Sequence, residues 1–215
     1  MNIASKTKLL KKQHTPIASA EKEAFASSTV SNAIMEFIAH VPNSQALSCN
    51  DPKKQTDACI KKAARNAALA AGSLALPIGP LGWLTILPEM LAVWKIQAQL
   101  VADIAAINGK KATLTRESMM YCLFKHSAAQ ATRDIAIRVG ERMLVKTASI
   151  RVLQSVAHKI GIKITQRAIG SGISRFVPLL GASAVAAYAY YDTTQVGKTA
   201  FKFFTLQIEE GVDLV

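Results

Sequence analysis

The stretch that decides the fold is Asn66–Pro88, which is NAALAAGSLALPIGPLGWLTILP and contains no charged residue. A straight helix of this length would span about 35 Å, enough to cross the core of a bilayer. Its centre contains two prolines and two glycines, namely Pro77, Gly79, Pro80 and Gly82. Proline removes a helical hydrogen bond and clashes with the preceding turn. We therefore expect two helices joined by an apolar elbow.

Hydrophobic periodicity predicts helices on both sides of this elbow. Upstream, one apolar face predicts a helix over residues 21–40, and Thr56 is a candidate N-cap for a second helix that ends at Ala71. Downstream, a helix is expected from about residue 84 to Ile107, where Asn108-Gly109 would end it.

The second half of the chain has weaker signals of the same kind. Thr113 or Thr115 is a candidate cap, and we expect helix onward to Gly170, with breaks near Gly140 and Gly161. The uncharged run 176–191 and a last helix over about 192–208 follow a second Gly/Pro elbow at residues 169–181. Since no stretch alternates with the two-residue period of a strand, the sequence predicts an all-α protein. The expected architecture is a compact helical bundle with two Gly/Pro-broken apolar helical hairpins.

The expected organisation has four parts. Residues 1–19 form a flexible basic tail, 20–58 an N-terminal helix and loop, 59–208 the main helical domain, and 209–215 a C-terminal tail. No apolar run follows the N-terminal lysines, which argues against a secretory signal peptide.

Charge and apolar content are combined unusually in this chain. The net charge is +12, yet charged residues are only 19% of the chain and hydrophobic residues are 50%. A disordered basic tail would be poor in apolar residues, so the composition favours a folded domain. Three cysteines are too few for a disulfide scaffold. We expect free thiols, with a Cys49–Cys59 bridge as the alternative.

The sequence contains no recognisable catalytic constellation, metal site or cofactor motif. Its four histidines are scattered, and Val196-Gly197-Lys198-Thr199 resembles only the end of a phosphate-binding loop. Asp192 stands where that loop needs glycine, and its carboxylate would repel phosphate. Glu89 and Asp103 fall on nearly one face of an apolar helix. We expect each of them to pair with a nearby lysine or to cap a helix, with a buried polar core as the alternative.

Basic residues dominate the region from 133 to 175, and their spacing of four predicts a shared helix face. The candidate anion-binding residues are Arg138, Arg142, Lys146, Lys159, Lys163 and Arg167. A basic amphipathic pattern is typical of binding to anionic membrane, and each such charge contributes roughly 1 kcal/mol there. A solvated face of a bundle is the alternative. Nucleic acid is disfavoured because aromatic residues are 6% and no recognition motif is visible.

The first elbow adds apolar residues that favour a membrane. Leu81, Trp83 and Leu84 are candidates for shallow insertion, because tryptophan favours the boundary between apolar and wet surroundings. The alternative is that both elbows form a buried hairpin core.

Residues 63–109 resemble the helical core of the EcsC family. The likeness rests on the Ala/Gly-rich helix, the elbow, and Leu87-Pro88-Glu89-Met90-Leu91, where the family pattern is Leu-Pro-Ala-Asp-Leu. Val177–Gly181 and Val196–Ala200 extend it to about residues 60–206, whereas Asn108 departs from the family pattern. The resemblance implies an α-helical, membrane-associated bacterial protein with no assigned catalytic residues.

Together these features predict a non-catalytic adaptor or regulator on the cytoplasmic face of the inner membrane. Its expected partners are anionic lipid and, in some contexts, a membrane protein complex. Two alternatives stay open: a lipid-modifying or hydrolytic enzyme that uses Glu89 or Asp103, and a soluble protein-interaction module.

Overall fold

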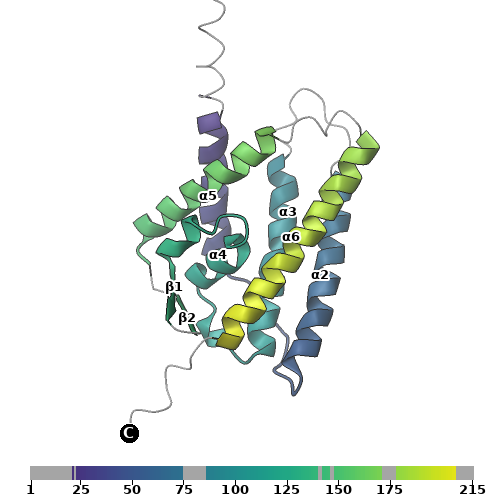
Figure 1. The fold of residues 1–215 in the computed structure, drawn as a ribbon, viewed down its shortest axis with the longest axis vertical. Helices are drawn as coiled ribbons and strands as arrows, with labels where there is room; N and C mark the ends of the chain where they lie inside the picture. Colours follow the sequence, from purple (N-terminus) through teal and green to yellow (C-terminus); the bar gives the residue numbers. More distant parts are fainter. Residues whose placement is uncertain are drawn as a thin grey trace, which may run out of the picture.

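The computed structural model describes residues 21, 23–74, 86–139, 142–145, 148–170 and 178–206. These residues form an all-α bundle, as the sequence predicts, together with one short hairpin (Figure 1). The predicted tails and the two elbows lie outside the described residues, apart from their edges.

The N-terminal helix covers residues 23–39, close to the expected range, and a loop over residues 41–49 follows it. Helix α2 then spans Pro52–Leu74. Its start differs from the prediction, because Asp51 rather than Thr56 caps it. The Asp51 carboxylate accepts a hydrogen bond from the Lys54 backbone N–H at 3.0 Å, and Pro52 suits the first helical position. Thr56 lies inside the helix and is buried.

Helix α3 spans Ile86–Ile107 and ends where the sequence predicts. Gly109 has φ 69°, the left-handed conformation that glycine adopts most easily, and Lys110 N donates to Ala105 O at 2.7 Å. A 3₁₀ turn, η1, covers Lys111–Thr113. Helix α4 spans Arg116–Phe124, and Thr115 forms a capping box with Ser118.

The prediction of helix from there to Gly170 is wrong between residues 125 and 149. A 3₁₀ helix, η2, covers Ala131–Asp134, and strands β1 (Ala136–Val139) and β2 (Arg142–Val145) pair as an antiparallel hairpin. The register places Val139 opposite Arg142. Ile137, Val139 and Val145 are β-branched, which favours strand over helix.

Two long helices complete the fold, α5 over Ile150–Gly170 and α6 over Pro178–Leu206. Gly161 does not interrupt α5. It lies where α5 meets the N-terminal helix, and a Cβ there would come within 2.7 Å of Ser27 O. Helix α6 begins earlier than expected, because the uncharged run is its first half and Pro178 occupies its first position.

One hydrophobic core joins these elements. It contains Ile34 and Ile38 of the N-terminal helix together with residues from α2 to α6. Trp94 of α3 is at its centre, packed edge-on against Phe124 of α4 with ring centroids 5.4 Å apart. Figure 1 shows α2, α3 and α6 side by side, with α4, α5 and the hairpin on the other side of α3. The N-terminal helix therefore packs into the same core as the main helical domain.

Candidate functional site

The basic residues expected on one helix face are divided between two kinds of structure. Arg138 lies in β1 and Arg142 in β2, so the expectation that they share a helix face is wrong. Lys146 lies outside the described residues. The helix ends before these positions because β-branched residues pair as strands on both sides of Gly140.

The remaining predicted cations do share a helix. Lys159 is exposed on α5, Lys163 is partly exposed, and Arg167 belongs to the same helix. Arg151 and His158 are also exposed on it. Helix α5 contains no acidic residue. Its opposite face is buried in the core through Leu153, Val156, Ala157 and Ile160. This helix is therefore amphipathic, with a basic surface whose charges have no carboxylate on the same helix.

Leu81, Trp83 and Leu84 lie outside the described residues, but the helices on either side of them are informative. The end of α2, the start of α3, the end of α5 and the start of α6 all lie at the upper end of the molecule in Figure 1. The N-terminal helix also begins at that end. Both elbows and the N-terminal segment are thus connected to the same end of the bundle.

Among the described residues, Met90–Ile107 of α3 is the segment long and apolar enough to cross a membrane. However, 56% of it is buried inside the protein. Trp94 and Gln97, which belong to it, face the core. The core helix of a soluble protein has the same length and composition, so this segment is weak support for a membrane span.

Asp103 is held by neighbouring polar groups. Ser44 Oγ donates to Asp103 Oδ1 at 2.6 Å, and Gln99 Nε2 donates to the same oxygen at 2.9 Å. Asp103 thus fastens the loop over residues 41–49 to α3. Glu89 belongs to the first turns of α3.

A polar cluster that sequence reasoning missed joins α3, α6 and the turn that follows α4. Asp192 of α6 accepts from Gln97 Nε2 at 2.7 Å and lies 2.5 Å from His126 Nε2. Gln97 Nε2 also donates to Thr193 Oγ1 at 3.1 Å, and the Gln97 side chain is only 1% exposed. A signal was available, because Gln97 is an uncharged polar residue in an apolar helix and Asp192 is the first charge after the uncharged run.

The geometry of this cluster suits structure rather than catalysis. Both carboxylate oxygens of Asp192 are occupied, and His126 Nδ1 is buried without a partner in the described part of the chain. A general base needs a ring nitrogen within reach of a substrate proton. Here one nitrogen binds Asp192 and the other does not reach solvent. No group of three or more metal-ligating side chains occurs among the described residues.

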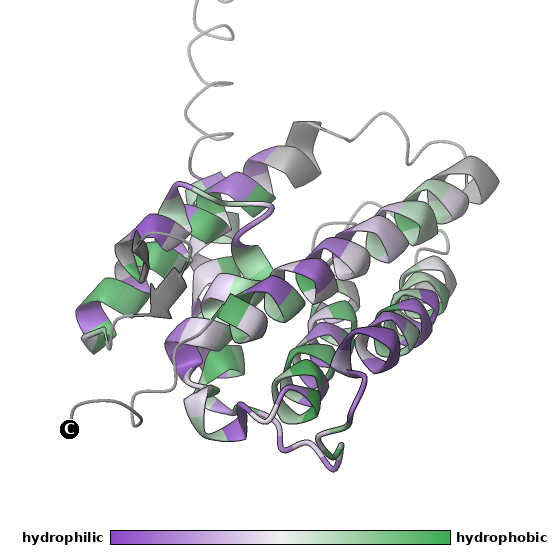
Figure 2. Cartoon of the chain, turned by 60° about the horizontal axis from the view of Figure 1, so that its bottom comes forward, coloured by the Kyte–Doolittle hydropathy of each residue, from purple (hydrophilic) through white to green (hydrophobic). Residues whose placement is uncertain are grey.

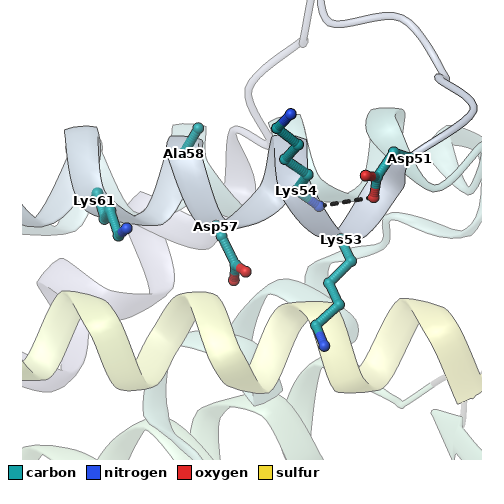
Figure 3. A pocket seen from close by; sticks show the side chains of 6 residues that line it. All are labelled: Asp51, Lys53, Lys54, Asp57, Ala58 and Lys61. Carbon is teal, nitrogen blue, oxygen red and sulfur yellow. Dashed lines mark hydrogen bonds between the residues drawn. The ribbon is translucent and has the colours of Figure 1, made fainter.

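The depression on the first turns of α2 also lacks the character of a small-molecule site. Figure 3 shows its lining, which comprises Asp51, Lys53, Lys54, Asp57, Ala58 and Lys61. Ligand pockets are mostly apolar with a few polar groups, whereas Ala58 is the only apolar residue among these six. This depression is a charged helix surface.

Residues 196–199 lie inside helix α6 and therefore do not form a phosphate-binding loop. Gly197 serves close packing there, because a Cβ on it would come within 2.5 Å of Ile60 Cγ1 on α2. The cysteines Cys49, Cys59 and Cys122 are free thiols, as expected.

Comparison with known protein families, with curated proteins and with solved structures found no match to this chain. The resemblance to the EcsC family therefore stays a prediction that rests on the residues quoted for it.

Proposed function

We propose that this protein binds the anionic cytoplasmic surface of a bacterial membrane and acts there as a non-catalytic adaptor or regulator. The observation that supports it most directly is the exposed surface of α5. Arg151, Lys159 and Lys163 lie on a helix without acidic residues, whose apolar face is already used in the core.

A basic surface attracts anionic lipid, and several charges acting together can hold a domain reversibly. The end of α5 lies at the same end of the bundle as the end of α2 and the starts of α3 and α6. Shallow insertion of Leu81, Trp83 and Leu84 at that end would add an apolar contribution to the electrostatic one. Stable attachment of a protein to a membrane commonly requires two such contributions.

The enzyme alternative has less support. Asp103 is bound to Ser44 and Gln99, and within the described residues His126 pairs with Asp192 in a half-buried cluster. We therefore favour a binding role over hydrolysis or lipid modification.

Vesicle flotation tests the proposal. The protein should float with vesicles that contain phosphatidylglycerol, and binding should weaken at high salt because salt screens exposed charges. Lys159→Glu/Lys163→Glu should weaken binding about tenfold or more. The matched control is Lys53→Glu/Lys54→Glu, which makes the same charge change at the opposite end of the bundle. Equal recovery on neutral and anionic vesicles would refute an electrostatic attachment.

A further inference from the structure

Exposed aromatic and aliphatic side chains gather on α2 and the first half of α6. Leu69 of α2 is 73% exposed, and Tyr191 of α6 is 59% exposed. Tyr188 and Tyr190 of α6 are exposed as well. We call these four residues, Leu69, Tyr188, Tyr190 and Tyr191, the tyrosine collar. Tyrosine is favoured where one side is apolar and the other is wet, as at the headgroup level of a membrane.

Charge is arranged in bands along the same two helices. Residues 66–74 of α2 and 178–191 of α6 contain no charged residue. On α2 the cation Arg65 comes directly before its uncharged segment, and Figure 2 shows this change from hydrophilic purple to paler and green colours. On α6 the acid Asp192 follows first, and the first cation is Lys198. The exposed cations of this basic band are Lys61, Lys62 and Arg65 on α2, and Lys198 and Lys202 on α6.

The packing of α2 against α6 brings like bands together. A Cβ on Gly72 would lie 3.3 Å from Ala186 Cβ, and one on Gly197 would lie 2.5 Å from Ile60 Cγ1. The helices are therefore antiparallel, with their uncharged segments side by side and their basic segments side by side. At 1.5 Å per residue, Lys198 lies about 10 Å beyond Tyr191 along the axis of α6.

We infer that this end of the α2–α6 pair docks end-on in an anionic leaflet, with the tyrosine collar at the headgroup level. The occupant of the collar is then lipid, and Arg65, Lys62 and Lys198 meet the phosphates from the water side. This order of apolar end, tyrosines and cations follows the polarity profile of a membrane interface. Glu21 and Glu23 lie near the same end, on the N-terminal helix, and reduce the attraction locally.

This inference rests on the proposed membrane binding but makes a separate statement about orientation. If α5 instead lay flat on the lipid, a residue at the middle of its outer face would be as deep as the collar. Ser155 is exposed at that position on α5. Thr205, which is exposed near the far end of α6, should stay in water in the end-on orientation.

Depth-dependent quenching separates these orientations. Single cysteines at Tyr191, Ser155 and Thr205, in a Cys49→Ser/Cys59→Ser background that keeps the buried Cys122, carry an environment-sensitive fluorophore. Vesicles contain phosphatidylglycerol and lipids spin-labelled near the headgroup. We expect strong quenching at 191, less at 155 and none at 205. Vesicle binding with equal quenching at 155 and 191, or with none at 191, would overturn the end-on orientation while leaving membrane binding intact. Failure of all variants and the wild type to bind would refute both.

Substitution of the collar gives an independent measurement. Tyr190→Ser/Tyr191→Ser should weaken vesicle binding about tenfold, because two interfacial rings are lost while the charge is unchanged. The matched control is Leu47→Ser, which removes another exposed apolar residue from the loop over 41–49. Unchanged binding together with a change in oligomeric state on sizing columns would show that the collar is a protein interface, and would overturn the inference.

Discussion

His126 Nε2 lies 2.5 Å from Asp192 Oδ1, although 66 residues separate the two in the sequence. The same carboxylate accepts a hydrogen bond from Gln97, a buried amide of α3. One side chain of α6 thus binds both α3 and the turn that follows α4. A buried polar group that loses its hydrogen-bond partner destabilises the folded protein. Each contact removed from this cluster should therefore lower the free energy of unfolding.

Asp192→Ala should therefore lower the free energy of unfolding by about 2–3 kcal/mol, because Gln97 and His126 both lose their acceptor. Asp192→Asn keeps one acceptor oxygen and should cost less. Urea unfolding followed by circular dichroism measures both. Asp57→Ala, which removes an exposed carboxylate of α2, is the control and should change stability by less than about 0.5 kcal/mol. Equal stability of Asp192→Ala and this control would show that the cluster contributes nothing.

Close packing of α6 against α2 predicts a graded response at two glycines. Gly197→Ala places a methyl group against Ile60 and Leu100, with contacts of 2.5 Å and 3.2 Å before relaxation, and should cost about 1–3 kcal/mol. Gly72→Ala meets Ala186 Cβ at 3.3 Å and Ala182 O at 3.9 Å, and the higher helix propensity of alanine, about 1 kcal/mol, offsets the closer contact. Thermal unfolding should rank the two variants in this order. Adding Ile60→Ala should recover part of the loss at Gly197, and the absence of any such coupling would argue against this contact.

Burial raises the pKa of the Cys122 thiol well above its ordinary value, whereas an unfolded thiol ionises near 8.5. The folded protein thus keeps a proton that the unfolded chain loses, so stability present below about pH 8.5 declines as the pH rises above it. The decline approaches about 1.4 kcal/mol per pH unit. Cys122→Ala lacks this contribution. Between pH 8 and 10 the wild type should lose about 2 kcal/mol more than the variant. If the wild type and Cys122→Ala gave parallel curves of stability against pH, the raised pKa of the Cys122 thiol would be contradicted.

Ser44 connects the loop after the N-terminal helix to α3 through Asp103. Its hydroxyl also accepts a hydrogen bond from Ala46 N at 3.0 Å, so it organises the loop as well as anchoring it. Ser44→Ala should cost about 1 kcal/mol and speed hydrogen exchange at the Ala46 amide. Ser48→Ala, at an exposed position of the same loop, should leave exchange unchanged. Equal exchange at Ala46 in both variants would show that the Ser44 hydroxyl does not organise the loop.

Local signals in the sequence predicted the helices well but not the contacts between them. The end of α3 at Gly109 and the cap of α4 at Thr115 depend on neighbouring residues, and both predictions are confirmed. Helix α2 begins at Pro52 and not near Thr56 as predicted. Aspartate and threonine are both good N-caps, and the proline at the first helical position favours Asp51. The pairing of His126 with Asp192 depends on how the turn after α4 lies against α6, which no local pattern specifies.

The hairpin was the main error in secondary structure, and its origin is specific. Apolar residues with cations four apart among them predict a helix from Ile135 to Val145. Gly140 predicts a break in it, but β-branched residues on both sides of a glycine also favour a hairpin. This error mattered for the candidate site, since it combined Arg138 and Arg142 with the cations of α5.

The separation of these cations leads to a last prediction about membrane attachment. Arg138→Glu/Arg142→Glu and Lys159→Glu/Lys163→Glu change the net charge equally, so long-range attraction to an anionic vesicle falls by a similar amount in both. Only the second pair lies on the acid-free surface of α5, whose end is shared with the elbows, whereas the hairpin lies toward the other end in Figure 1. Lys159→Glu/Lys163→Glu should therefore weaken binding to phosphatidylglycerol vesicles several-fold more, and the difference should shrink as salt screens short-range contacts. Equal losses would mean that net charge alone governs attachment, in which case α5 has no special role in it.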